Sequence, residues 1–250
     1  EGEISIEISG YTDESGLVGD TITKTTDSSK IIYDRTAPTI NSISPNGNTT
    51  WQKVQKTVVS ASDNLTSNDK IIGKYVFVPE GESVADIENI FQNNSEIVKQ
   101  DGTGKYILYI QVEDLAGNTR LAVTNPFYLD NQVTEAGKIK ITKDSKTGEE
   151  LVPTEKTDTE GNKYYEITYT NKNLYITKID GKDDESGHKS TIYEVNTILA
   201  DGTKISVGTP SIEDTIIETA GDYEIIVTTK DNLDNSAKRK YKIHIDRSGP

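Results

Sequence analysis

The sequence contains no cysteine, which excludes disulfide bonds, thiolate metal sites and cysteine nucleophiles. Methionine is also absent, there is a single tryptophan, and only 32% of the residues are hydrophobic. No apolar run reaches the roughly 18 residues that a membrane-spanning helix needs, and no charged start precedes an apolar segment. We therefore expect no direct membrane insertion by this segment.

Basic residues are also in short supply, because 27 Lys and Arg face 41 Asp and Glu and leave a net charge of −14. A nucleic acid is not an expected partner, since its phosphates would be repelled and no basic stripe compensates. An anionic membrane surface is disfavoured for the same reason. The acidity suits a well-solvated surface and also suits divalent cations.

Isoleucine, valine and tyrosine supply much of the apolar content, a mixture that favours strands. A pattern of strand, Asp-led turn and strand occurs three times in the sequence. The turns start at Asp13, Asp114 and Asp231, and an aspartate follows each second strand at Asp34, Asp130 and Asp246. A domain end that recurs in this way indicates domains in tandem.

The spacing predicts an all-β chain with two complete immunoglobulin-like antiparallel sandwiches, at residues 37–130 and 131–250. Residues 1–36 carry only two predicted strands, too few for a stable unit in water. They fit either the closing hairpin of a preceding, incomplete immunoglobulin-like domain or a hairpin donated to another chain.

One short helix is predicted inside the first complete domain. Ser83 is a candidate N-cap, and Asp86 follows it three positions later. The apolar residues of this segment share one helical face: Val84, Ile87, Ile90 and Phe91.

Two segments resemble the tandem immunoglobulin-like (Big-type) repeats of secreted bacterial surface and adhesin-like proteins. In that family a D-x-A-G-N loop joins the last two strands and I-D-x-T-A-P links consecutive domains; the matching residues are Asp114-Leu115-Ala116-Gly117-Asn118 and Tyr33-Asp34-Arg35-Thr36-Ala37-Pro38. The turn after Asp231 departs from this motif, and the linker after Asp130 lacks the proline. The resemblance implies extracellular stalks, adhesins, S-layer-type proteins or spacers beside surface enzymes.

The Asp- and Asn-rich loops are candidate calcium sites, because Ca²⁺ takes six to eight oxygen ligands from carboxylates, amides and carbonyls. The candidate ligands in the first complete domain are Asp63, Asp69, Asp114 and Asn118, and those in the second are Asp180, Asp183, Asp184, Asp231 and Asp234. Asp34, Asp130 and Asp246 could contribute where one domain leads into the next. Alternatively, these residues are turn formers whose side chains bind local backbone N–H groups.

Catalysis has little support. His188 and His244 are far apart in sequence and lie near no G-x-S-x-G elbow, so we expect no enzyme and no required cofactor. Trp51 is either a platform for a sugar ring or an ordinary packing residue.

The sequence thus predicts a non-enzymatic stalk or spacer of a large secreted protein on the bacterial cell surface or cell wall. Its expected partners are neighbouring immunoglobulin-like domains of the same polypeptide. The alternative is a ligand-binding adhesin or carbohydrate-binding module that contacts a host or cell-surface glycan or protein, or an accessory region of a surface hydrolase.

Overall fold

The computed structural model describes residues 1–84, 86–207 and 215–248, which form strands, turns and loops but no helix. The chain divides into two compact units. The first consists of Glu1–Thr50, Val54–Gln100 and Lys105–Tyr128, and the second of Trp51–Lys53, Asp101–Gly104 and Leu129–Pro250. Since the described part of the chain has no helix, it also has none that is long and apolar enough to cross a membrane.

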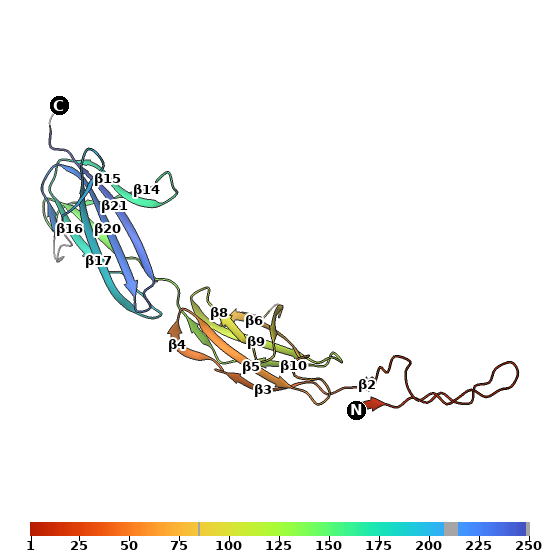
Figure 1. The fold of residues 1–250 in the computed structure, drawn as a ribbon. Helices are drawn as coiled ribbons and strands as arrows, with labels where there is room; N and C mark the ends of the chain where they lie inside the picture. The colour runs from red at the N-terminus through yellow and green to blue at the C-terminus, as the bar shows by residue number, and fades with distance from the viewer. Residues whose placement is uncertain (85, 208–214, 249–250) are drawn as a thin grey trace. The chain divides into compact units, whose positions relative to one another are not determined.

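The first sandwich is built from nine strands (Figure 1). They are β3 (Thr39–Ser44), β4 (Asn48–Gln52), β5 (Gln55–Ser62), β6 (Ile72–Pro79), β7 (Asn89–Gln92), β8 (Glu96–Lys99), β9 (Gly104–Glu113), β10 (Thr119–Val123) and β11 (Phe127–Leu129). One sheet has the order β3-β5-β8, and the other has the order β4-β11-β9-β6-β7 with β10 also paired to β9.

The core of the first sandwich lies between these two sheets. Val59 and Ile97 come from the three-stranded sheet, and Leu108, Ile110 and Phe127 come from the other. They belong to one buried cluster, so the sheets face each other. Every second residue is buried along β5, and also along β9 from Leu108 to Val112, which is the period of two of a strand.

In the described residues of the second sandwich, the chain forms ten strands. They are β12 (Lys138–Lys143), β13 (Glu150–Leu151), β14 (Thr154–Thr157), β15 (Lys163–Thr170), β16 (Leu174–Ile179), β17 (His188–Ile198), β18 (Lys204–Ser206), β19 (Thr215–Ile217), β20 (Gly221–Asp231) and β21 (Ser236–Ile245). They form one sheet in the order β13-β12-β16-β19 and another in the order β14-β15-β21-β20-β17-β18.

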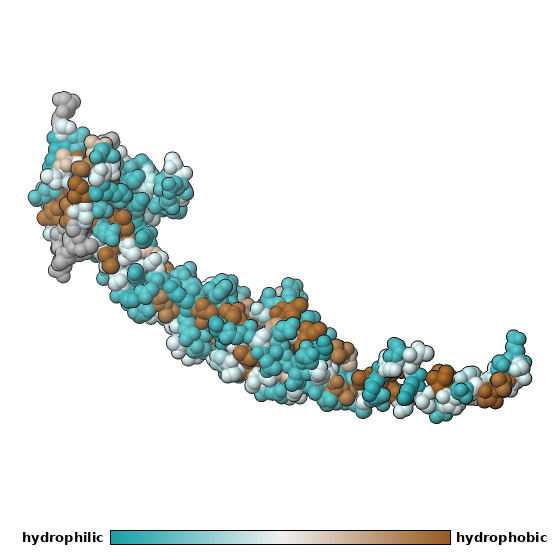
Figure 2. All heavy atoms as spheres, viewed as in Figure 1, coloured by the Kyte–Doolittle hydropathy of each residue, from teal (hydrophilic) through white to brown (hydrophobic). Residues whose placement is uncertain are grey.

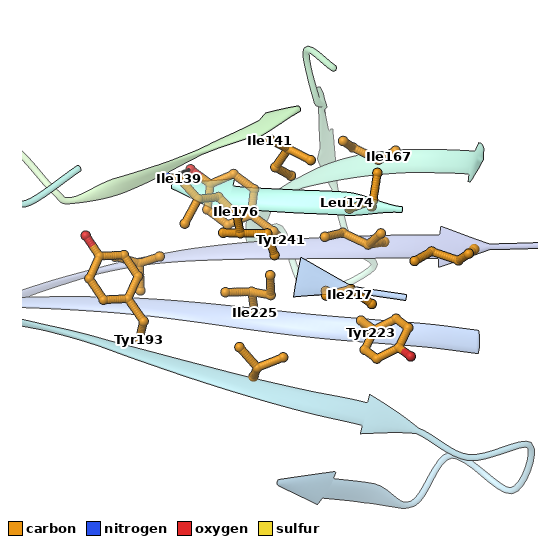
Figure 3. Packing of buried hydrophobic residues seen from close by; sticks show 14 residues of the cluster. Ile139, Ile141, Ile167, Leu174, Ile176, Tyr193, Ile217, Tyr223, Ile225 and Tyr241 are labelled. Carbon is orange, nitrogen blue, oxygen red and sulfur yellow. Dashed lines mark hydrogen bonds between the residues drawn. The ribbon is translucent and has the colours of Figure 1, made fainter. Parts of the chain in front are cut away.

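The core of the second sandwich is drawn in Figure 3. Ile141, Leu174 and Ile217 from the smaller sheet pack in one cluster with Ile225 and Tyr241 from the larger sheet. Several members of this cluster are tyrosines, whose large rings fill the space between the layers.

The two sandwiches share one strand order. In one layer, β3 corresponds to β12, β5 to β16 and β8 to β19, and the strands of each set pair in that order. In the opposite layer, β4 corresponds to β15, β11 to β21, β9 to β20 and β6 to β17. The strands of each set again lie side by side in that order. The second sandwich differs by the added strands β13 and β14, and its single long strand β21 stands where the first sandwich has the two strands β10 and β11 beside β9. This arrangement is that of an immunoglobulin-like sandwich.

The predicted helix over residues 83–91 is wrong. Among its described residues, Ile90 and Phe91 belong to β7, which pairs with β6. Phe91 is buried in the core whereas Ile90 is 71% exposed, the alternation of a strand. A segment this short gains too few helical hydrogen bonds to offset nucleation, so pairing with β6 prevails.

Residues 1–33 form a hairpin that begins with β1 (Gly2–Ile4) paired to β2 (Ile31–Tyr33). Isolated bridges, Ile8 to Ile22 and Thr12 to Val18, continue it towards the turn. Its large apolar side chains are exposed, and Figure 2 shows apolar surface on this segment; they are Ile4, Ile8, Tyr11, Leu17, Val18, Ile22, Ile31, Ile32 and Tyr33. Neither buried hydrophobic cluster includes any of them.

Candidate metal centres

Three aspartates of the first unit form a compact group, here named the first cluster: Asp34, Asp63 and Asp114. Each contributes one carboxylate oxygen, and these oxygens all lie within 4.8 Å of one another. Asp34 follows β2, Asp63 follows β5 and Asp114 follows β9. The cluster therefore joins the segment that leads into the sandwich to two loops at one end of it.

The second unit has the same arrangement in Asp130, Asp183 and Asp231, here named the second cluster. Its carboxylate oxygens also lie within 4.8 Å of one another. Asp130 follows β11, Asp183 lies between β16 and β17, and Asp231 ends β20. Each member thus has the place in the strand order that its counterpart has in the first cluster.

Burial differs between the two clusters. Asp130 and Asp231 are fully buried, and Asp183 is only 8% exposed. In the first cluster Asp114 is buried, whereas Asp34 and Asp63 are half-buried. Ionised carboxylates at this spacing repel one another, and they do so more strongly where water is excluded.

The turn that follows β9 or β20 orients one aspartate of each cluster. Asp114 Oδ1 accepts the N–H groups of Ala116 (2.8 Å) and Asn118 (2.9 Å). Asp231 Oδ1 accepts those of Leu233 and Asn235, both at 2.8 Å. The fourth residue of each turn has a positive φ, 86° at Gly117 and 61° at Asp234. Glycine adopts this conformation readily and Asp tolerates it, so both sequences form the same turn.

Asp63 is the member of the first cluster with an unsatisfied oxygen. Its Oδ1 accepts the N–H groups of Leu65 (2.9 Å) and Thr66 (2.7 Å). Its Oδ2 is buried and has no hydrogen-bond partner among the described residues. A buried charged oxygen without a donor is costly, and a bound cation would remove that cost.

The corresponding residue Asp183 is held from both sides. Its Oδ1 accepts the N–H (3.2 Å) and the hydroxyl (3.3 Å) of Thr134, and its Oδ2 accepts the N–H of Gly187 (2.8 Å). Asp130 is tied to the same loop, because Ser186 donates its N–H to Asp130 Oδ2 at 3.2 Å. These hydrogen bonds hold the side chains of Asp130 and Asp183 in place.

Several predicted ligands lie outside both clusters. Ser67 donates its hydroxyl to Asp69 and lowers the pKa of that carboxyl. Lys182 pairs with Asp184 at 2.5 Å, and Tyr193 donates its hydroxyl to Asp180 at 3.4 Å. Neither Asp69, Asp180 nor Asp184 belongs to a group of three acidic side chains in the described part of the chain.

Asp234 and Asn118 also have other roles. Lys189 lies 2.7 Å from Asp234 and lowers the pKa of that carboxyl. The amide nitrogen of Asn118 donates to Asp114 Oδ2 at 2.9 Å, so this side chain supports a cluster member. Asn235 does the same for Asp231 at 2.6 Å. The sequence did not predict this role, because the turn that contains Asn235 departs from the family motif.

The predicted residues that do converge are Asp63, Asp114, Asp183 and Asp231. The leading residues Asp34 and Asp130 complete the clusters. Oxygen-only ligands of this kind suit hard cations, Ca²⁺ in particular, because Ca²⁺ accepts irregular sets of carboxylate and carbonyl oxygens.

No family model matches the chain, and no curated protein does. Solved structures similar to it include fibronectin(III)-like modules of Clostridium thermocellum CbhA, at 17% identity and a TM-score of 0.25 over 84% of this chain and 94% of that one. The chicken CNTN1 FN1–FN3 domains give 10% identity and a TM-score of 0.32 over 90% and 76%.

A third similar structure is the sialic acid binding region of a Streptococcus sanguinis adhesin, with 12% identity and a TM-score of 0.25 over 86% of this chain and 78% of that one. Scores and identities this low establish neither a common arrangement of the whole chains nor a shared function.

Proposed function

We propose that this chain is a non-enzymatic spacer segment of a secreted bacterial surface protein, made of tandem immunoglobulin-like repeats, in which Ca²⁺ fastens the leading segment of each sandwich to its loops. The observation that carries the proposal is the recurrence of one three-aspartate cluster at the same place in both strand orders. Turn-forming aspartates alone would satisfy local N–H groups and would not have to converge from three separate segments.

The mechanism follows from the position of the leading aspartates. Asp34 and Asp130 lie in the short segments that enter the sandwiches, directly after β2 and β11. An ion that binds them together with two loop aspartates crosslinks three segments of the same unit. The entering segment then loses conformational freedom, which suits a protein that holds other domains at a distance. The neighbouring immunoglobulin-like domains of the same polypeptide would be its partners.

The test is a Ca²⁺ titration of the metal-free full chain, followed by native mass spectrometry and calorimetry. We expect one ion per cluster, with dissociation constants near the ~0.1–1 mM range of extracellular modules. Asp114→Asn should remove the ion of the first cluster and Asp231→Asn that of the second. The matched controls are Asp69→Asn and Asp234→Asn, which change acidic loop residues outside the clusters.

The spacer role has a separate readout, because ion binding should also narrow the distribution of dimensions measured by small-angle scattering. Failure to bind any ion at several millimolar Ca²⁺ would remove the cation from the proposal. Stoichiometric binding that leaves the scattering curve unchanged would contradict the stiffening role and leave only a local structural one.

A further inference from the structure

The outer face of the larger sheet of the second unit gathers lysines, although the chain as a whole has a net charge of −14. In this sheet β15, β21, β20 and β17 lie side by side (Figure 1). Ile225 of β20 and Tyr241 of β21 are cross-strand partners that point into the core. Side chains alternate along a strand, so the residues on either side of them point away from the core. Six lysines of the sheet point outwards in this way and are here named the lysine face: Lys156, Lys204, Lys230, Lys238, Lys240 and Lys242.

Two glutamates of the same face lie under these lysines. The side chain of Glu224 is only 3% exposed, and it pairs with Lys204 at 2.7 Å and with Lys240 at 3.7 Å. The side chain of Glu166 is 11% exposed and pairs with Lys156. The three lysine side chains in these pairs are 38–50% exposed. Ammonium groups rather than carboxylates therefore reach the solvent at these positions.

Few exposed acids share the lysine face. Among the described strand residues of this sheet they are Glu194 and Asp222, and His244 Nδ1 lies 2.5 Å from Asp222 Oδ1. Six lysines against two exposed carboxylates make the local potential positive. No basic stripe is visible in the sequence, because the lysines come from four strands and alternate with core residues such as Tyr241.

The lysines of β21 are regularly spaced. Lys238, Lys240 and Lys242 are alternate residues of one strand, so their Cα atoms follow one another at about 6.7 Å. Uncharged polar side chains share the face, with Thr228 opposite Lys238 and Asn196 opposite Glu224. A linear polymer with a negative charge on its repeating units can meet several of these lysines at once, whereas a small anion meets one or two.

The other side chains of the lysine face favour a polysaccharide over a nucleic acid. Single-stranded nucleic acids are held largely by stacking of their bases on aromatic side chains. Among the described strand residues of this sheet, Tyr164 is the tyrosine that shares the face, and the ammonium of Lys242 lies 4.2 Å from the centre of its ring. Hydroxyl and amide groups such as those of Thr228 and Asn196 can instead exchange hydrogen bonds with sugar hydroxyls.

We propose that the lysine face binds an acidic polysaccharide, a linear chain whose repeating sugars carry carboxylates. The occupant is identified by charge complementarity: the lysines bind the carboxylates, and the neutral polar side chains bind the sugar hydroxyls. Glu224 and Glu166 have a positioning role, because they hold their lysine partners on the sheet. This inference goes beyond the proposed spacer function and does not depend on the cation clusters.

The test is a binding titration of the full chain with polygalacturonate, a linear polysaccharide with one carboxylate per sugar. A chelator is present throughout, so that the cation clusters play no part. The parent chain should bind, and binding should weaken as the ionic strength rises from about 20 mM to about 150 mM.

The double variant Lys238→Gln/Lys242→Gln should lower the affinity about fivefold, because each exposed ion pair contributes a small part of the binding free energy. These two lysines are chosen because Lys204 and Lys240 hold the buried Glu224. The matched control is Lys140→Gln/Lys172→Gln, which removes the same charge outside the lysine face and should leave the affinity unchanged.

A second variant, Lys230→Gln/Lys238→Gln, should have the same effect and keeps the contact of Lys242 with Tyr164. Thermal unfolding shows whether each variant is folded. The inference is overturned if the parent chain does not bind at low ionic strength, or if the control pair weakens binding as much as the face variants do. Tighter binding of polyglutamate or of a single-stranded DNA oligomer of equal charge would also overturn it. None of these results bears on Ca²⁺ binding, which is tested separately.

Discussion

The two clusters place three corresponding aspartates in different surroundings. The second cluster is buried at all three residues, and its Asp183 receives donors on both oxygens. The first cluster is half-buried at Asp34 and Asp63, and Asp63 Oδ2 has no donor among the described residues. A buried group of carboxylates depends more on a counter-ion than a partly solvated one, because water cannot screen the repulsion.

This difference teaches that strand order fixes where a cluster forms, while the loops decide how firmly its carboxylates are held. Thr134 and Ser186 tie Asp130 and Asp183 into one network. In the first cluster, the carboxylate of the leading residue Asp34 accepts a hydrogen bond only from the N–H of Thr36 among the described residues. We therefore expect the second cluster to bind more tightly, because less of the binding free energy is spent on ordering the ligands.

The largest losses of stability are expected from substitutions in the two hydrophobic cores. They test whether the two units unfold independently. Leu108→Ala in the first unit and Leu174→Ala in the second each remove a fully buried side chain. Each should lower the stability of its own unit by about 2–5 kcal/mol through lost burial and a residual cavity. Hydrogen exchange measured unit by unit is the readout, with Leu121→Ala on the exposed face of β10 as the control. Equal loss of protection in both units would show that they unfold together.

The next largest loss of stability is expected on removal of Ca²⁺, and its size in each unit compares the two clusters. At a Ca²⁺ concentration about 100 times the dissociation constant, an ion stabilises its unit by about 2.7 kcal/mol. Chelation should therefore lower the melting temperature of both units, and that of the second more. Asp231→Asn should abolish the Ca²⁺ response of the second unit alone, and Asp114→Asn that of the first alone. A larger response from the first unit would overturn our ranking of the two clusters.

A smaller effect of opposite sign is expected for Asp34→Asn. The carbonyl oxygen of asparagine can still accept the N–H of Thr36, so the local turn is retained. In metal-free protein the substitution removes one of three repelling charges and should raise the stability of the first unit by about 1 kcal/mol. In saturating Ca²⁺ it removes a ligand and should lower that stability. A change of the same sign in both conditions would contradict a cation site.

Much of the fold was readable from the sequence because it rests on local signals. Runs rich in isoleucine, valine and tyrosine marked β9 and β20, and Asp-led turns marked the loops that follow them. The helix prediction failed at Ile90 and Phe91, because these residues lie on opposite faces of β7, which pairs with β6. Pairing with a distant strand is a tertiary effect that no local pattern reveals.

The candidate sites were only partly readable, for a similar reason. Asp63, Asp114, Asp183 and Asp231 were identifiable because they lie in Asp- and Asn-rich loops. Asp234 lies in the same kind of loop, but its side chain pairs with Lys189, which is 45 residues away in the sequence. Composition cannot separate an aspartate that meets other carboxylates from one that meets a lysine, because the distinction depends on strand pairing.

The last predicted effect depends on pH and concerns Lys178 of the second unit, whose ammonium lies 4.6 Å from the centre of the Tyr193 ring. Burial lowers the pKa of Lys178 from 10.5 to about 8. Because the folded-state pKa is the lower one, the folded chain binds fewer protons than the unfolded chain between these values, and stability rises with pH across that window. Below about pH 8 the lysine is charged in both states and the full cost of burying it remains.

Lys178→Met should therefore stabilise the second unit near pH 7, and the gain should shrink as pH rises from about 8 towards 10.5. We expect a gain below about 2 kcal/mol, because the substitution also removes an attraction to the Tyr193 ring of about 0.5–1 kcal/mol. Thermal unfolding as a function of pH is the measurement, with Lys74→Met in the first unit as the control. A gain that is independent of pH would show that methionine acts by filling space, and a loss at pH 7 would show that the contact with the ring outweighs the cost of burial.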